Sequence, residues 1–264
     1  MGGLANAVLA ASLALTGAPA LPLDALTIWQ RSLIAQRFGD LRTLGTLTTR
    51  FTNGEEVVLK VELLAMMQRD GVSRMGLTRV ISGSALLNSA FLNIERPGTS
   101  GDLWIYLPGV GTPRRLVSSN LGDSYLGSEF RYGDLVQRDP AMYSATLRDD
   151  DAIDGEACTV IEIVPHEPRF VRDSGLAREV LWLRKASFVE RRVEQYDRRG
   201  QLLKIIDLQR VFFDPRSGKS FPIERRIRNM QSGATSIAVF EGVRPNVGLS
   251  PDLFSPAHLA DRSW

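Results

Sequence analysis

The sequence is poor in the residues on which most catalytic and metal sites are built. Among its 264 residues there is one cysteine, Cys158, and there are two histidines, His166 and His258. A single cysteine excludes an intramolecular disulfide, and the three residues together have no ligand spacing typical of a zinc site. We therefore expect no metal, no cofactor and no enzymatic activity, and we expect Cys158 to be a small buried side chain in an apolar strand.

The chain also lacks an excess of charge of either sign. It contains 32 basic and 30 acidic residues, which gives a net charge of +2. This balance provides no electrostatic reason to expect nucleic acid as a partner. A hydrophobic content of 44% and a charged content of 23% are ordinary for a folded globular protein.

Two segments imitate functional motifs without completing them. Gly122-Asp123-Ser124 resembles the nucleophile block of GDSL esterases, but the position three residues before His258 is not the aspartate which that family requires. Residues 149–156 imitate a calcium-binding loop, yet Ala152 and Ile161 occupy positions where oxygen ligands are needed. Neither segment predicts a catalytic or metal site.

The N-terminus has the composition of an export signal. Residues 4–23 contain no charged side chain, and Ala18-Pro19-Ala20 has the small residues of a signal-peptidase site. We expect a signal peptide over residues 1–20, a periplasmic location, and a single mature domain over residues 21–264. The absence of Lys and Arg from residues 1–3 leaves an uncleaved apolar anchor as the alternative.

Strand patterns dominate the mature chain. Helical spacing is confined to residues 24–38, and from residue 44 onward we expect about a dozen strands, one of them continuous over residues 202–213. Short turns such as Asn53-Gly54 join successive strands, and such turns require antiparallel pairing. The fold class predicted is mainly β, with an antiparallel sheet that must curl or be covered to protect its edges.

Arginine doublets recur among these strands. Arg191-Arg192, Arg198-Arg199 and Arg225-Arg226 alternate with acidic residues. We expect cross-strand ion pairs on a solvated face of the sheet, which would explain the doublets without a ligand.

Aromatic and basic residues gather in one short region of the chain. They are Trp104, Tyr106, Arg114, Arg115, Tyr125, Phe130 and Tyr132. Apolar walls with a few polar groups at the mouth are typical of a small-molecule pocket, and arginine suits a phosphate or carboxylate headgroup. Residue chemistry leaves an alternative equally open, in which the aromatic residues are core and the arginines pair with nearby carboxylates. The site we predict is ligand-binding and consists of these seven residues.

The same region resembles the signature of the outer-membrane lipoprotein-sorting family, the LolA- and LolB-like periplasmic carriers. Residues 103–135 are similar to its pattern W-I-Y-L-P, R-R, S, then G-S-x-F-x-Y-x-D-L, in that order. The resemblance implies an incomplete β-barrel covered by helices. It also implies an apolar cavity that carries a lipid or lipoprotein acyl chain between an inner-membrane exporter and an outer-membrane acceptor complex.

The resemblance leaves two functional hypotheses. The first is a carrier that passes the acyl chain toward the outer membrane. The alternative is an accessory module that docks on a lipid exporter of the resistance-nodulation-division type and carries nothing. Only the carrier needs an open apolar cavity inside the curled sheet.

Overall fold

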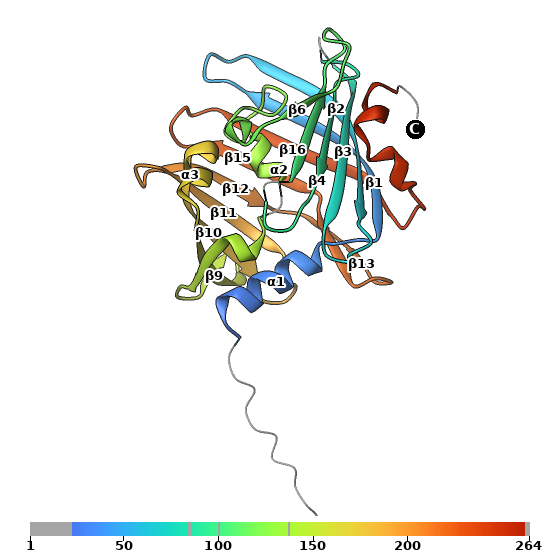
Figure 1. The fold of residues 1–264 in the computed structure, drawn as a ribbon. Helices are drawn as coiled ribbons and strands as arrows, with labels where there is room; N and C mark the ends of the chain where they lie inside the picture. The colour runs from blue at the N-terminus through green and yellow to red at the C-terminus, as the bar shows by residue number, and fades with distance from the viewer. Residues whose placement is uncertain (1–22, 84–85, 100, 137, 262–264) are drawn as a thin grey trace, which may run out of the picture.

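The protein is built on one strongly curled antiparallel sheet, as a computed structural model shows for residues 23–83, 86–99, 101–136 and 138–261 (Figure 1). The predicted signal peptide over residues 1–20 lies outside the described residues. Within the described ranges, no helix is long and apolar enough to cross a membrane.

The first half of the sheet is a meander of strands in chain order. These strands are β1 (Asp40–Arg50), β2 (Glu56–Met67), β3 (Arg74–Ser82), β4 (Ala90–Ile94), β5 (Asp102–Tyr106) and β6 (Arg114–Leu116). The predicted Asn53-Gly54 turn joins β1 to β2, and Gly54 has the positive φ of 86° that a tight turn of this kind requires.

The second half of the sheet comes from the C-terminal part of the chain. Its strands are β7 (Tyr143–Leu147), β8 (Asp151–Ile153), β9 (Glu156–Pro165), β10 (Leu176–Arg184), β11 (Glu190–Asp197), β12 (Leu202–Leu208), β15 (Glu224–Asn229) and β16 (Thr235–Pro245). The last strand, β16, pairs with β1 and joins the two halves into one fourteen-stranded sheet. The end strands β6 and β7 do not pair, so the sheet is an incomplete barrel, as predicted.

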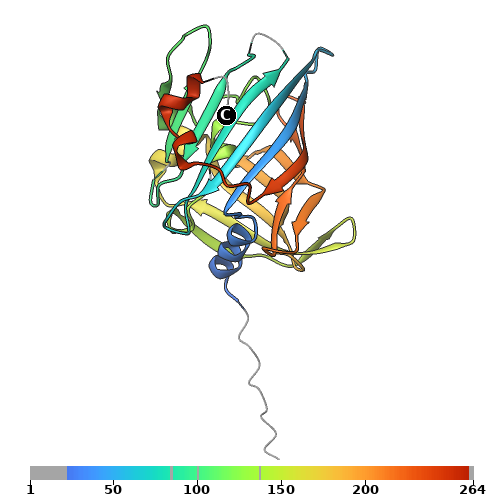
Figure 2. The ribbon, with the colours of Figure 1, turned by 90° about the vertical axis from the view of Figure 1, so that its right-hand side faces the viewer.

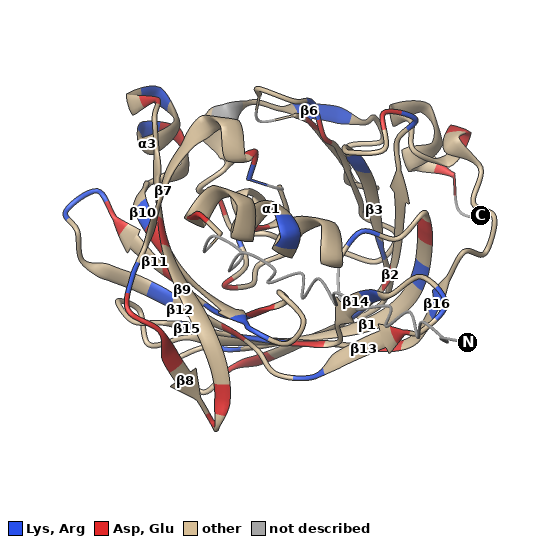
Figure 3. Ribbon diagram, turned by 90° about the horizontal axis from the view of Figure 1, so that it is seen from below, with Lys and Arg blue, Asp and Glu red and all other residues tan. Residues whose placement is uncertain are grey.

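Short helices cover the open parts of this barrel. They are α1 (Ala25–Ala35), α2 (Tyr132–Leu135) and α3 (Pro168–Ser174), with 3₁₀ turns η1 (Ser118–Asn120), η2 (Pro140–Met142), η3 (Pro251–Leu253) and η4 (Pro256–Ala260). Helix α1 confirms the prediction for residues 24–38, and the Asp24 carboxylate caps it by accepting from the Thr27 N–H at 2.7 Å. Viewed from below, α1 lies across one open end of the curled sheet (Figure 3).

Successive residues of each strand face opposite sides of the sheet, and in β2 to β5 both sides are apolar. In β5, Leu103 and Ile105 belong to the main core inside the curl. Trp104 and Tyr106 belong to a second cluster outside it, together with Phe254 of the C-terminal segment. That segment, with η3 and η4, packs on the outer face against β4 and β5 (Figure 2).

The structure corrects the prediction of one continuous strand over residues 202–213. Strand β12 ends at Leu208, and residues 211–214 form β13 (Val211–Asp214), which pairs only with β14 (Lys219–Pro222) in a separate two-stranded sheet. The turn after Asp214 accounts for the pairing of β13 with β14. Gly218, at φ 67°, donates its N–H to the Asp214 carbonyl at 2.9 Å and returns the chain onto β13.

The arginine doublets also differ from the prediction of a solvated face. Neighbouring residues of a strand face opposite sides, so a doublet cannot lie on one face. Arg191 is only 5% exposed and pairs with Asp154 and Glu156, while Arg225 lines the interior of the curl. The outward members, Arg192 and Arg226, do form the expected cross-strand or neighbouring ion pairs.

Candidate functional site

A cavity of about 180 Å³ lies inside the curled sheet, beneath α1 and the segment that contains α2. Strands β1 to β4 provide about half of its wall, and β15 provides Arg225. Its apolar lining consists of Leu33, Phe38, Leu41, Leu63, Leu64, Ala65, Phe91, Leu135, Val136 and Phe221. Its charged lining consists of Arg74, Asp134, Arg138, Glu190 and Arg225.

The size of the cavity limits what it holds in this conformation. Small-molecule pockets commonly measure about 300–1,000 Å³, and an apolar cavity of about 150 Å³ takes a molecule the size of benzene. A cavity of about 180 Å³ therefore accommodates part of an acyl chain. A complete chain requires the covering segments and the sheet to separate.

The cover over the cavity is fixed by aromatic packing. Tyr132, the first residue of α2, lies 5.3 Å from the ring of Phe91 on β4, and Phe91 lines the cavity. Tyr125 completes a triad, with ring centroids 5.4 Å from Phe91 and 5.8 Å from Tyr132. Such edge-on and tilted contacts are favourable for aromatic pairs, so the triad holds α2 against the inner face of the sheet.

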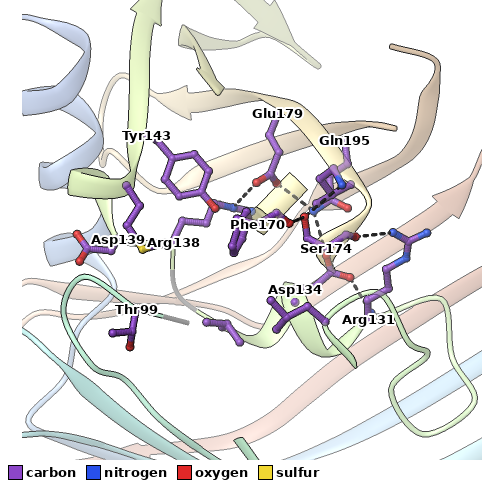
Figure 4. A pocket seen from close by; sticks show the side chains of 15 residues that line it. Thr99, Arg131, Asp134, Arg138, Asp139, Tyr143, Phe170, Ser174, Glu179 and Gln195 are labelled. Carbon is purple, nitrogen blue, oxygen red and sulfur yellow. Dashed lines mark hydrogen bonds and ion pairs between the residues drawn. The ribbon is translucent and has the colours of Figure 1, made fainter. Parts of the chain in front are cut away.

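A ladder of polar side chains crosses the inner face beside the cavity. Glu179 on β10, Gln195 on β11 and Lys204 on β12 are direct cross-strand neighbours. The Gln195 amide Nε2 donates to Glu179 at 2.9 Å and to Asp134 of α2 at 2.9 Å, and Arg138 pairs with Glu179 at 2.9 Å. Figure 4 shows Glu179, Gln195, Asp134 and Arg138 around a small pocket of about 30 Å³, which has room for about one water molecule.

The two carboxylates bridged by Gln195 have opposite pKa shifts. Burial favours the neutral form of both. For Asp134, the charge and hydrogen bond of Lys204 overcome burial and hold the pKa below its usual value. For Glu179, burial outweighs the charge of Arg138, so the pKa is raised.

The structure separates the seven predicted ligand-binding residues. Tyr125, Phe130 and Tyr132 are buried in the main core inside the curl. Trp104 and Tyr106 pack against the cluster on the outer face.

The remaining two, Arg114 and Arg115, are exposed on the end strand β6, where Arg115 pairs with Asp102. None of the seven is among the described residues that line the cavity. Tyr132 and Tyr125, however, contact Phe91, and Phe91 lines the cavity. Their role in ligand binding stays a prediction.

Sequence reasoning missed the charged residues that line the cavity. Arg74, Arg138 and Arg225 are indistinguishable by composition from the many exposed arginines of the chain. A partial signal existed for Arg225, which alternates with the apolar residues Ile223 and Ile227 in a strand pattern.

Residues that imitated enzymatic sites have ordinary structural partners. The Ser124 hydroxyl donates to the Ser128 carbonyl at 2.6 Å, His166 contacts Ser144, and His258 contacts Ser255. Cys158 is fully buried, as predicted, and burial raises the pKa of its thiol. Among the described residues, no three His, Cys, Asp or Glu side chains are grouped as metal ligands would be.

Comparisons with known proteins agree with this architecture. A family model described as an uncharacterized protein matches residues 73–261. A domain from Vibrio parahaemolyticus, assigned as an outer membrane lipoprotein-sorting protein, has a similar crystal structure with a TM-score of 0.82 and 26% identity. That match covers 89% of this chain and 98% of the other. No curated protein matches the sequence.

Two more solved structures share the fold. A DUF1329 family protein from Desulfovibrio piger has a TM-score of 0.81 at 19% identity, over 90% of this chain and 100% of the other. A LolA superfamily protein from Nitrosomonas europaea has a TM-score of 0.68 at 18% identity, over 89% of this chain and 98% of the other. At these identities the two structures show the fold alone.

Proposed function

We propose that this protein, whose curled sheet is similar to that of a lipoprotein-sorting domain and shares the fold of a LolA superfamily protein, is a periplasmic carrier which binds an acyl chain inside the sheet. The observation that carries the proposal is the cavity of about 180 Å³ inside an incomplete barrel, walled by aliphatic and aromatic side chains. Shielding such a chain from water is favourable by about 0.8 kcal/mol for each buried CH₂ group.

Uptake and release require a cover that can move. Helix α1 suits this role because it lies across the open end of the barrel (Figure 3). Trp29 packs edge-on against Tyr143 at 5.5 Å, and the Lys219 ammonium donates to the Ile34 carbonyl at 3.0 Å. Displacement of α1 would enlarge the cavity, since Leu33 of this helix forms part of its wall.

Five of the seven residues predicted from the sequence take part in this proposal. Tyr125, Phe130 and Tyr132 support the cover over the acyl chain. Arg114 and Arg115, exposed on the end strand β6, are available to an exporter or acceptor complex in the envelope. Transfer toward the outer membrane is proposed from the similarity to the lipoprotein-sorting domain of Vibrio parahaemolyticus.

The position of Gly76 allows a direct test of the cavity. Gly76 lines the cavity on the inner face of β3, and a Cβ atom added there meets no other atom within 4 Å. Gly76→Phe should therefore fill the cavity without disturbing the sheet. Gly109→Phe is the matched control, because Gly109 is exposed in a turn and has equally open surroundings.

The measurement is native mass spectrometry of the three proteins, purified without detergent from a periplasmic extract and then incubated with hexadecanoate. We expect a stoichiometric adduct on the natural protein and on Gly109→Phe, and none on Gly76→Phe. Equal adducts on all three would place the ligand outside the cavity. A bare mass for every protein would refute carriage and favour the docking module.

A further inference from the structure

One cationic side chain that lines the cavity has no counterion among the residues that the structure describes. Ile223, directly before β15, and Ile227 on β15 pack into the core inside the curl, and Arg225 between them lines the cavity. The outward residues of the same strand, Arg226 and Arg228, are 48% and 53% exposed. Strand alternation therefore places a guanidinium on the apolar side of the sheet.

The other arginines of the cavity wall are neutralised. Arg74 pairs with Glu95 at 3.4 Å, and Arg138 pairs with Glu179 at 2.9 Å and with Glu190 at 3.1 Å. Arg225 forms no ion pair with any described carboxylate, and its Nε is shielded from solvent without a hydrogen-bond partner among the described residues. The guanidinium carbon of Arg225 lies 5.9 Å from the centre of the Phe221 ring.

The surroundings of Arg225 disfavour its charge. Burial lowers its pKa to about 10, and the charges of Arg74 and Arg138 act in the same direction. Glu190 opposes them but is already paired with Arg138. The guanidinium still carries its charge at neutral pH, in a place where an apolar side chain of similar length would be less costly to bury.

A guanidinium of this kind is suited to one class of ligand group. Its planar fork of N–H donors matches the two oxygens of a carboxylate or a phosphate, and burial strengthens such a pair. Apolar residues adjoin it, since Phe221, Leu41 and Leu63 line the same cavity. The complement of this arrangement is a molecule with an anionic end and a hydrocarbon chain.

We propose that the cavity ligand is an anionic amphiphile, whose carboxylate or phosphate binds the Arg225 guanidinium while its acyl chain lies against Leu41 and Leu63. This inference rests on the proposed carrier function and narrows its cargo to molecules that carry a negative charge beside the chain. A neutral long-chain alcohol would fill the apolar wall and leave Arg225 unpaired.

The test compares three probes that share a sixteen-carbon chain: hexadecanoate, 1-hexadecanoyl lysophosphatidate and 1-hexadecanol. Each is titrated by calorimetry at pH 8 and below its aggregation concentration. The proteins are the natural chain, Arg225→Gln, and Arg228→Gln as the control on the outer face of the same strand. We expect Arg225→Gln to weaken binding of an anionic probe about 10- to 100-fold, as loss of a hydrogen bond to a charged group predicts.

The outcomes separate this inference from the carrier proposal. Tighter binding of hexadecanoate than of the lysophosphatidate, or the reverse, would identify the anionic group as a carboxylate or a phosphate. Tighter binding of either anion than of the alcohol supports the inference if Arg228→Gln retains this preference. Equal binding of the alcohol and the anions by the natural chain and by Arg225→Gln would overturn the inference and leave carriage intact. Failure of all three probes to bind the natural chain would overturn carriage itself.

A thermal unfolding experiment tests whether Arg225→Gln is folded. Without a probe, Arg225→Gln should melt at or above the temperature of the natural chain, because it removes an unpaired, half-buried charge. Added hexadecanoate should raise the melting temperature of the natural chain and of Arg228→Gln, and raise that of Arg225→Gln much less. A large fall in the melting temperature of unliganded Arg225→Gln would assign Arg225 a structural role instead.

Discussion

The Lys204 ammonium on β12 lies 2.5 Å from the Asp134 carboxylate of α2, and the two side chains are only 1% and 5% exposed. Asp134 also accepts from the Arg131 N–H at 2.7 Å and from Gln195 at 2.9 Å. The pair connects the inner face of the sheet to the segment that covers the cavity. This buried ion pair therefore acts together with the aromatic triad to position and stabilise that cover.

Removing one partner of this pair should be strongly destabilising. Lys204→Met leaves the Asp134 carboxylate buried without its counterion, and we expect the free energy of unfolding to fall by about 3–5 kcal/mol in urea denaturation. The double variant Lys204→Met with Asp134→Leu should recover much of this loss, since no charge is left unpaired.

The matched control is Lys185→Met, which breaks an exposed ion pair with Asp150. Exposed pairs contribute little, so this variant should unfold almost as the natural chain does. Equal destabilisation by Lys204→Met and Lys185→Met would show that burial of the Lys204–Asp134 pair has no energetic consequence.

Acid should weaken the fold through Asp134. The folded-state pKa of Asp134 is lowered, because Lys204 and the hydrogen bonds outweigh burial. Its contribution to stability is fully present above the unfolded pKa of about 3.9 and is lost as the pH falls through the lower folded value. We expect the stability difference between the natural chain and Asp134→Asn to be largest near neutral pH and to shrink in acid.

Urea unfolding at a series of pH values measures this difference. Asp149→Asn serves as the control, because Asp149 is exposed. A stability gap between the natural chain and Asp134→Asn that stays constant down to the most acidic condition would contradict the assignment.

Helix α1 should depend strongly on the Trp29 side chain for its position. Trp29 is fully buried and packs edge-on against Tyr143, whereas Leu26 of the same helix is 40% exposed. Trp29→Ala should lower the free energy of unfolding by about 3–5 kcal/mol and increase hydrogen exchange over α1. Leu26→Ala should change both quantities little. Similar exchange in the two variants would mean that α1 is held mainly by other contacts.

Two aromatic residues with the same predicted role should behave differently. Trp104 packs in the outer cluster with Phe254, and Tyr132 packs inside the curl against Phe91. We expect Trp104→Ala to retain the affinity for hexadecanoate. Its free energy of unfolding should fall by less than the loss of about 3–5 kcal/mol that follows replacement of a fully buried tryptophan by alanine. Tyr132→Ala should weaken binding, because it loosens the cover. Reduced affinity of Trp104→Ala in calorimetry would instead place the ligand on the outer face.

Local pattern determined the helix at the N-terminus, the Asn53-Gly54 hairpin and the antiparallel strands. Capping, turn residues and side-chain periodicity act within a few residues of each other, so they can be read without the fold. The pattern did not show where the strand that begins at residue 202 ends. Residues 202–213 are rich in apolar side chains and contain no glycine or proline, and only the pairing of β13 with β14 shows that the strand ends at Leu208.

The sequence by itself determined that Trp104 and Tyr106 face one side of a strand and that Leu103 and Ile105 face the other. It could not determine which side encloses the cavity, because both sides are apolar and the C-terminal segment that covers the outer side comes about 150 residues later. In the same way, the pairing of β16 with β1 curls the sheet and places Arg225, rather than Arg226, inside it. Tertiary structure decided the site, since closure of the sheet depends on contacts between distant segments.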